Sequence, residues 1–133
     1  MSGSRVYYLD SSAIVKLALE EPESVALRRH LAGTKTRVSS ALAQVEVVRA
    51  LASCGPVEAE RGRAILREID IVRIGGDVLS RAATLGPPGL RSLDAIHLAT
   101  ALLFGDELRH IVTYDARLAA AARAAGLRVT APA

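Results

Sequence analysis

Four acidic residues of this chain occupy positions from which their carboxylates could act together. Asp10 and Asp115 each follow an apolar run of the kind that forms a strand. Asp94 lies near the start of an amphipathic helical segment, and Glu46 lies at the margin of an apolar helical stripe. Several carboxylates in close contact stay ionised only if a positive charge lies among them. Clustering of the four would therefore require a bound cation.

The kinds of ligand present indicate which cation this would be. Oxygen ligands without paired cysteine or histidine select hard ions, so Mg²⁺ is expected, with Mn²⁺ able to substitute. The three histidines, at positions 30, 97 and 110, lack the spacing of a zinc site. The sequence therefore favours a hard dication over Zn²⁺.

Each acid also has an ordinary structural explanation. Asp10, Asp94 and Asp115 start predicted helices, where a carboxylate accepts backbone N–H groups and is favoured by the helix dipole. Glu46 could pair with Arg49, three residues later on the same helix. Each explanation suffices for one residue taken alone. Taken together, the four acids favour a metal site.

Neighbouring side chains could support such a site. Ser12 and Thr113 lie close in sequence to two of the acids and could bond a carboxylate or a water on the metal, although hydroxyls at helix starts usually act as caps. His97 follows Asp94 by three positions and could orient a carboxylate or touch a phosphate. For His97 we favour the interpretation of a packed structural histidine.

Strands that alternate with helices must position these residues. The patterns predict strands at 6–9, 37–39, 69–74, 110–113 and 127–130, and helices at 13–18, 24–32, 41–52, 57–67, 77–85, 92–103 and 116–125. Ser92 is expected as the N-cap of the sixth helix, and the third helix is expected to bury a stripe through Val45 and Ala52. This order predicts an α/β fold with a mostly parallel sheet of about five strands, covered on both faces. Ligands of such sheets bind at the carboxyl ends of the strands.

Composition sets the broad class of protein. A length of 133 residues, half of them hydrophobic, favours a single domain over residues 1–133. No apolar run approaches the roughly 18 residues of a membrane span, and residues 1–5 lead directly into the first strand, so a soluble cytoplasmic protein is expected. The net charge of +3 permits nucleic-acid binding. Because aromatic residues are scarce, RNA contacts should be mainly to the backbone.

Four segments that contain the acids resemble the acidic motifs of the PIN domain, and more narrowly those of the VapC toxins of bacterial type II toxin–antitoxin systems. They are Tyr8 to Lys16 (YLDSSAIVK), Gln44 to Leu51 (QVEVVRAL), Arg91 to Ala99 (RSLDAIHLA) and Val112 to Leu118 (VTYDARL). The segments occur in the family's order and cover nearly the whole chain. The third and fourth are quite specific.

This resemblance implies a PIN-like three-layer α/β/α sandwich and an acidic quartet of Asp10, Glu46, Asp94 and Asp115 around Mg²⁺. It also implies an endoribonuclease that acts on RNA and is inhibited by a VapB-type antitoxin. The assembly expected from the resemblance is a homodimer that forms a heterotetramer or larger complex with the antitoxin.

The expected mechanism is metal-assisted hydrolysis of a phosphodiester bond. Asp10 and Asp94 would hold the principal ion directly, whereas Asp115 and Glu46 would act through water or on a second ion. Water activated in this way does not use the ribose 2′-hydroxyl. Cleavage should therefore leave a 5′-phosphate and a 3′-hydroxyl.

Two other functions are compatible with parts of the sequence. A receiver-like phosphoacceptor domain also places carboxylates and Mg²⁺ at strand ends, but it needs a second acid beside the first strand and a lysine after the last one. Arg128 lies in the last predicted strand instead. A PIN-like fold could also serve as a binding partner without catalysis, although an intact acidic quartet argues against this.

Overall fold

A five-stranded parallel sheet forms the centre of the molecule. The computed structural model describes residues 5–33 and 36–133, so part of the segment expected to precede the first strand lies outside the described residues. The strands are β1 (Val6–Leu9), β2 (Thr36–Ser40), β3 (Asp70–Val72), β4 (Leu108–Val112) and β5 (Val129–Thr130). They pair in the order β3-β2-β1-β4-β5, and every pairing is parallel. The predicted parallel sheet is confirmed.

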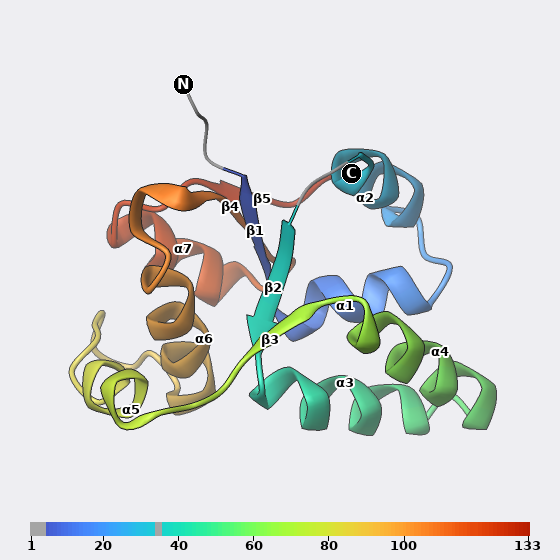
Figure 1. The fold of residues 1–133 in the computed structure, drawn as a ribbon, viewed down its shortest axis with the longest axis horizontal. Coiled ribbons are helices and arrows are strands. Elements are labelled where there is room, and N and C mark those ends of the chain that lie inside the picture. The colour runs from blue at the N-terminus through green and yellow to red at the C-terminus, as the bar shows by residue number, and fades with distance from the viewer. Residues whose placement is uncertain (1–4, 34–35) are drawn as a thin grey trace.

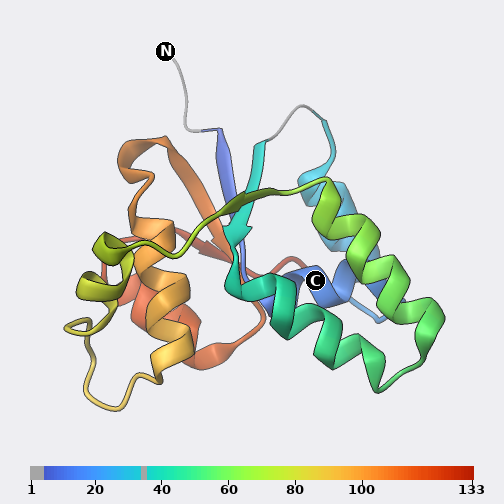
Figure 2. The same ribbon diagram turned by 60° about the horizontal axis from the view of Figure 1, so that its bottom comes forward.

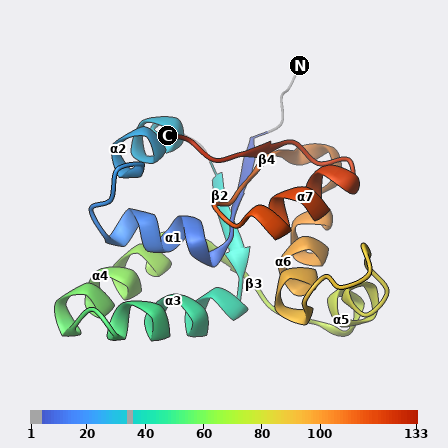
Figure 3. The same cartoon turned by 180° about the vertical axis from the view of Figure 1, so that it is seen from behind.

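Helices cover both faces of this sheet, as Figure 1 and the view from behind in Figure 3 show. The helices of one face are α1 (Ser11–Ala18), α2 (Ser24–Leu31), α3 (Leu42–Ala52) and α4 (Pro56–Arg67). Those of the other are α6 (Ser92–Leu102) and α7 (Ala116–Ala124), with α5 (Gly76–Ala82) packed on α6 and a 3-10 turn, η1 (Gly105–Glu107), before β4. The result is a three-layer α/β/α arrangement. No helix in the described part is long and apolar enough to cross a membrane.

Strand β1 separates two hydrophobic cores. Tyr7 and Leu9 face the core shared with α1 to α4, whereas Val6 and Tyr8 face the core shared with α6 and α7. All four side chains are buried because both faces of a parallel sheet are covered by helices. Asp10 follows immediately, so the first carboxylate leaves the sheet at the centre of the molecule.

The buried face of α3 differs from the prediction. Val45, expected inside, is 57% exposed, and Ala52 is also exposed. The buried residues are Ala43, Val47 and Leu51. Apolar residues lie on nearly every side of this helix, so several stripes have similar hydrophobicity. Packing against α4 decides which one is buried.

Two helix starts also differ from the prediction. Ser40 still belongs to β2, and α3 begins at Leu42, one residue after the expected start; the Ser40 hydroxyl accepts a hydrogen bond from the Leu42 N–H. Arg91, in an extended conformation, is the N-cap of α6, and Ser92 is already helical. In contrast, Asp115 caps α7 as predicted. Because α6 begins directly after Arg91, this arginine lies at the edge of the pocket described below.

Candidate active site at the carboxyl edge of the sheet

A pocket of about 360 Å³ opens where the strands end. Figure 2, in which the lower edge of Figure 1 comes forward, shows β1 and β2 running into α1 and α3 at this edge. The lining residues are Asp10, Ser11, Ser12, Glu46, Arg91, Ser92, Leu93, Asp94, His97 and Asp115. All four predicted acids are among them. They reach the pocket from four separate parts of the chain.

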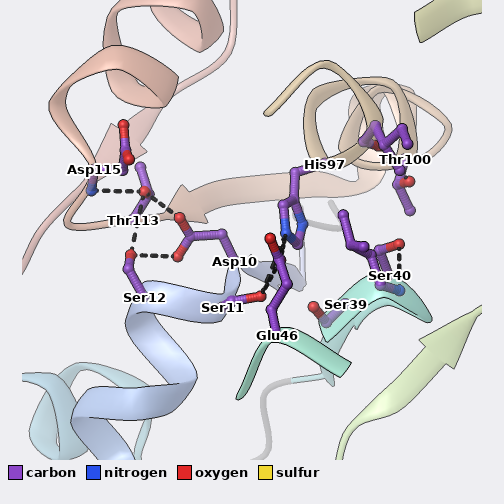
Figure 4. Close-up of polar contacts among 12 residues, drawn as sticks. Asp10, Ser11, Ser12, Ser39, Ser40, Glu46, His97, Thr100, Thr113 and Asp115 are labelled. Atoms are coloured by element: carbon purple, nitrogen blue, oxygen red, sulfur yellow. Dashed lines mark hydrogen bonds and ion pairs between the residues drawn. The ribbon is translucent and has the colours of Figure 1, made fainter. Parts of the chain in front are cut away.

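Asp10 is the most buried of the acids, with 4% of its surface exposed. Its Oδ1 accepts hydrogen bonds from the Ser12 hydroxyl at 2.6 Å and the Ala13 N–H at 3.0 Å, and Thr113 donates to its Oδ2. Figure 4 shows Ser12 and Thr113 next to the carboxylate, each linked to a different one of its oxygens. Burial raises the pKa of Asp10, and these hydrogen bonds offset only part of that effect. A nearby cation would stabilise the ionised form.

Ser12 and Thr113 therefore both contact the first carboxylate, as the sequence suggested. Ser12 also accepts a hydrogen bond from the Tyr114 N–H, and Thr113 accepts one from the Asp115 N–H at 3.0 Å. The two hydroxyls thus connect the end of β1 to the loop between β4 and α7. This connection fixes Asp10 relative to Asp115.

Glu46 does not pair with Arg49 in the part of the chain that the structure describes. Its Oε1 accepts a hydrogen bond from the Ser11 hydroxyl at 2.6 Å and lies 2.8 Å from Nε2 of His97. Burial raises the pKa of Glu46, but the contacts with His97 and Ser11 outweigh it, so the pKa is lowered overall. Glu46 is therefore an ionised carboxylate at the pocket wall.

Arg91 connects the two remaining acids. Its Nε lies 3.4 Å from Oδ2 of Asp94, and its Nη2 lies 3.7 Å from Oδ2 of Asp115. The Arg91 side chain is 59% exposed, whereas that of Asp94 is 14% exposed. Asp115 also caps α7, because its Oδ1 accepts from two backbone N–H groups. Arg91 lies in the third of the motif segments, but the sequence assigned it no role, because its contacts depend on the loop before α6.

The donor atoms of the pocket suit a hard, hydrated cation. Within residues 5–33 and 36–133, no three His, Cys, Asp or Glu side chains are arranged so that they could hold an ion between them. The acids thus surround a pocket and do not form the tight cluster first expected. Mg²⁺ usually keeps several waters and takes one or two carboxylates directly. Four carboxylates around an open space of this size fit such an ion.

The sequence matches the family model of the PIN domain over residues 7–124, which is most of the chain. The chain belongs to the PIN-domain family. This PIN domain is 53% identical over 125 residues to Ribonuclease VapC46 of Mycobacterium tuberculosis, with 94% of this chain and 96% of that protein covered. It is 41% identical over 130 residues to Ribonuclease VapC47 of the same organism, with the same coverage. The resemblance to VapC proteins is therefore confirmed.

Solved structures agree on the fold. The PIN domain superposes on Mycobacterium tuberculosis VapC20, described as a sarcin-ricin loop cleaving toxin, with a TM-score of 0.75 at 17% identity, covering 95% of this chain and 99% of that one. A toxin-antitoxin complex from Klebsiella pneumoniae gives a TM-score of 0.71 at 22% identity, covering 96% and 98%. The PIN-like sandwich is thus confirmed, and the receiver-like alternative is not supported.

Proposed function

We propose that this PIN domain is a VapC-like endoribonuclease toxin that hydrolyses RNA phosphodiester bonds with Mg²⁺. The observation that carries the proposal is the pocket at the carboxyl edge of the sheet, where Asp10, Glu46, Asp94 and Asp115 meet. Relatives of more than 40% identity that cover nearly the whole chain are named ribonucleases. The names of these relatives support the kind of reaction, and the pocket supports the place where it occurs.

The carboxylates would each have a defined part in this reaction. Asp10 and Asp94 would hold the ion directly, while Glu46 and Asp115 would act through water or on a second ion. When bound, Mg²⁺ supplies an electrophile that stabilises charge on the phosphate and lowers the pKa of the attacking water. The protein's contribution is to orient its carboxylates before substrate arrives, so that little reorganisation is needed during the reaction.

The surroundings of His97 favour hydrolysis by water over attack by the ribose 2′-hydroxyl. Attack by the 2′-hydroxyl without a metal needs side chains that can exchange protons with the substrate. His97 is the histidine that lines the pocket, but it is 3% exposed and both ring nitrogens contact protein side chains. It is therefore poorly placed to take a proton from RNA.

The nature of the product ends tests this proposal. The purified chain, incubated with RNA and Mg²⁺, should yield fragments with a 5′-phosphate and a 3′-hydroxyl, and EDTA should abolish their formation. Sequencing of the ends with and without prior phosphatase treatment distinguishes these products from 2′,3′-cyclic phosphates. Cyclic phosphate ends, or cleavage that persists in EDTA, would contradict the proposal.

We also propose a VapB-type antitoxin as the partner that neutralises the enzyme, within a homodimer that forms a heterotetramer or larger complex. A basic side chain of the antitoxin could bind in the acidic pocket and block it. Arginine suits this role because its guanidinium can bind a carboxylate through two parallel hydrogen bonds. Within the chain, the Arg91 guanidinium already lies 3.4 Å from an oxygen of Asp94 and 3.7 Å from an oxygen of Asp115. A partner arginine would find the same acceptor oxygens.

Arg91→Gln should tighten binding of Mn²⁺ to the free protein. The substitution removes a positive charge that competes with the ion for Asp94 and Asp115. Because exposed ion pairs contribute less than about 1 kcal/mol, we expect a decrease in Kd of roughly two- to fivefold. Titration followed by electron paramagnetic resonance of free Mn²⁺ measures this, with Arg81→Gln, on the exposed surface of α5, as the matched control. Unchanged or weaker binding would show that Arg91 does not compete with the ion.

A further inference from the structure

His97 connects the wall of the pocket to the hydrophobic core behind it. Its Nδ1 lies 2.6 Å from the hydroxyl of Tyr8, and its Nε2 lies 2.8 Å from Oε1 of Glu46. Tyr8 is fully buried between the sheet and α6, and His97 is 3% exposed. In Figure 4 the imidazole of His97 points at the Glu46 carboxylate. The three side chains form one continuous polar chain from the core to the pocket.

The hydrogen bonds that join Tyr8, His97 and Glu46 restrict where the protons of these three side chains lie. Glu46 is an ionised carboxylate and can only accept a hydrogen bond, so Nε2 of His97 must carry a proton. Burial, with a further contribution from the charge of Asp10, raises the pKa of Tyr8 well above its usual value, so Tyr8 is a neutral phenol. On the other side of the ring, Nδ1 of His97 shares a 2.6 Å hydrogen bond with the Tyr8 hydroxyl. Tyr8 thus anchors the imidazole at Nδ1 while its Nε2 faces Glu46.

We propose that Tyr8 and His97 are positioning residues, which hold the Glu46 carboxylate in the orientation that metal binding and RNA cleavage require. This inference rests on the proposed function, because it assigns a task to Glu46 in that site. Ser11 and His97 both contact Oε1 of Glu46, and two contacts at one oxygen restrict the rotation of the carboxylate and so limit the directions of its other oxygen. Neither Tyr8 nor His97 touches the substrate in this scheme.

A purely structural role would not require this geometry. The other two histidines, His30 and His110, pack against Tyr7 on the opposite face of β1, with ring centroids 5.4 to 5.8 Å apart. They contribute to packing without lining the pocket. His97 is placed differently, since its two nitrogens contact a core phenol and an acidic pocket residue. Groups that orient metal-binding side chains in this way typically contribute 10–100-fold to metal affinity or activity.

Three variants and one control test the proposal. His97→Leu should lower kcat about tenfold or more and weaken Mn²⁺ binding by a similar factor. His97→Gln should recover most of both losses, because its amide can place an N–H donor near the position of Nε2. Tyr8→Phe should have an intermediate effect, since the imidazole keeps its packing but loses the hydrogen bond at Nδ1. His110→Leu, the same change on the opposite face, should leave both quantities nearly unchanged.

A measurement on the unmodified protein avoids any dependence on folding of the variants. Long-range ¹H–¹⁵N correlation spectra of the imidazoles report which ring nitrogen carries a proton. We expect His97 to be protonated at Nε2, with its signals displaced in Tyr8→Phe and Glu46→Gln. A neutral His97 protonated at Nδ1 would overturn the proposal.

The remaining outcomes separate this inference from the proposed function. If the wild-type chain cleaves RNA but His97→Leu retains its kcat and its Mn²⁺ affinity, the positioning role is wrong and the nuclease assignment stands. The positioning role is equally wrong if His97→Gln melts like the wild type yet is no better than His97→Leu. If the wild-type chain does not cleave RNA, the proposed function fails, while the tautomer and the Mn²⁺ affinities still test the role of His97.

Discussion

Asp94→Asn should reduce the rate of RNA cleavage at least about a hundredfold. Loss of an outer-shell partner of a metal typically costs 10–100-fold, and a residue that holds the ion directly should cost more. Asparagine keeps the size and the carbonyl oxygen of aspartate but removes the charge that attracts the cation. The effect should appear mainly in kcat, because the charge on the phosphate increases in the transition state.

The fold should tolerate this change. Asp94 lies in the first turn of α6, where its carboxylate contacts the exposed Arg91 side chain. The melting temperature of Asp94→Asn should therefore stay close to that of the wild type. Asp77→Asn provides the matched control, since Asp77 also lies in the first turn of a helix, α5, but outside the pocket. Initial rates on a labelled RNA, after removal of contaminating nuclease, measure the effect, and an unchanged rate would refute the assignment of Asp94.

Local sequence patterns were sufficient to place three of the four acids. Asp10 and Asp115 follow strands and accept hydrogen bonds from helix N-termini, as the cap preferences of aspartate predict. Asp94 falls in the first turn of α6. Because parallel strands bring their carboxyl ends to one edge, the common location of Asp10 and Asp115 follows from the predicted sheet, whereas that of Asp94 depends on the packing of α6. This part of the site depends on short-range information, which a single sequence contains.

Contacts between distant segments could not be predicted in this way. Glu46 and His97 are 51 positions apart, and Tyr8 and His97 are 89 apart. Their contact depends on how α3 and α6 pack against the sheet. The same limitation explains the wrong stripe on α3, because neighbouring apolar faces of one helix are distinguished by packing against other helices. His97 is buried, as a packed histidine would be, but its contact with Glu46 joins it to the pocket.

Asp10→Asn should abolish cleavage and at the same time stabilise the protein in EDTA at neutral pH. Burial raises the pKa of Asp10 in the folded chain above its value in the unfolded chain, which is about 3.9. A carboxyl group of this kind binds its proton more tightly when folded, so it favours folding at low pH. Its contribution decreases as the pH rises from about 4 through the folded pKa, and above that range the ionised group opposes folding.

Asparagine can occupy the same place without the charge. Its Oδ1 can accept from the Ser12 hydroxyl and the Ala13 N–H, as the aspartate does. Its Nδ2 would face Thr113, whose hydroxyl oxygen can accept this hydrogen bond if its own proton turns toward Ser12 Oγ, 3.5 Å away. The substitution therefore removes a buried charge and gives one of the two Nδ2 protons an acceptor, while the second must bond to water in the pocket that residue 10 lines.

Thermal unfolding as a function of pH, with and without Mg²⁺, measures this trade between stability and function. In EDTA at pH 7 the variant should melt a few degrees above the wild type, the shift that about 1 kcal/mol produces in a domain of this size, and the difference should vanish toward pH 4. Mg²⁺ should reverse the order, because an ion that binds only the folded wild type adds about 2.7 kcal/mol at a hundred times its Kd.

A variant that is less stable than the wild type in EDTA would mean that Asp10 is retained for its hydrogen bonds. A variant that Mg²⁺ still stabilises would mean that the ion is held elsewhere. The predicted reversal requires that the Asp10 charge opposes folding in the absence of metal. It also requires that a bound cation compensates for this charge. A carboxylate that destabilises the fold but is needed for metal binding behaves in this way.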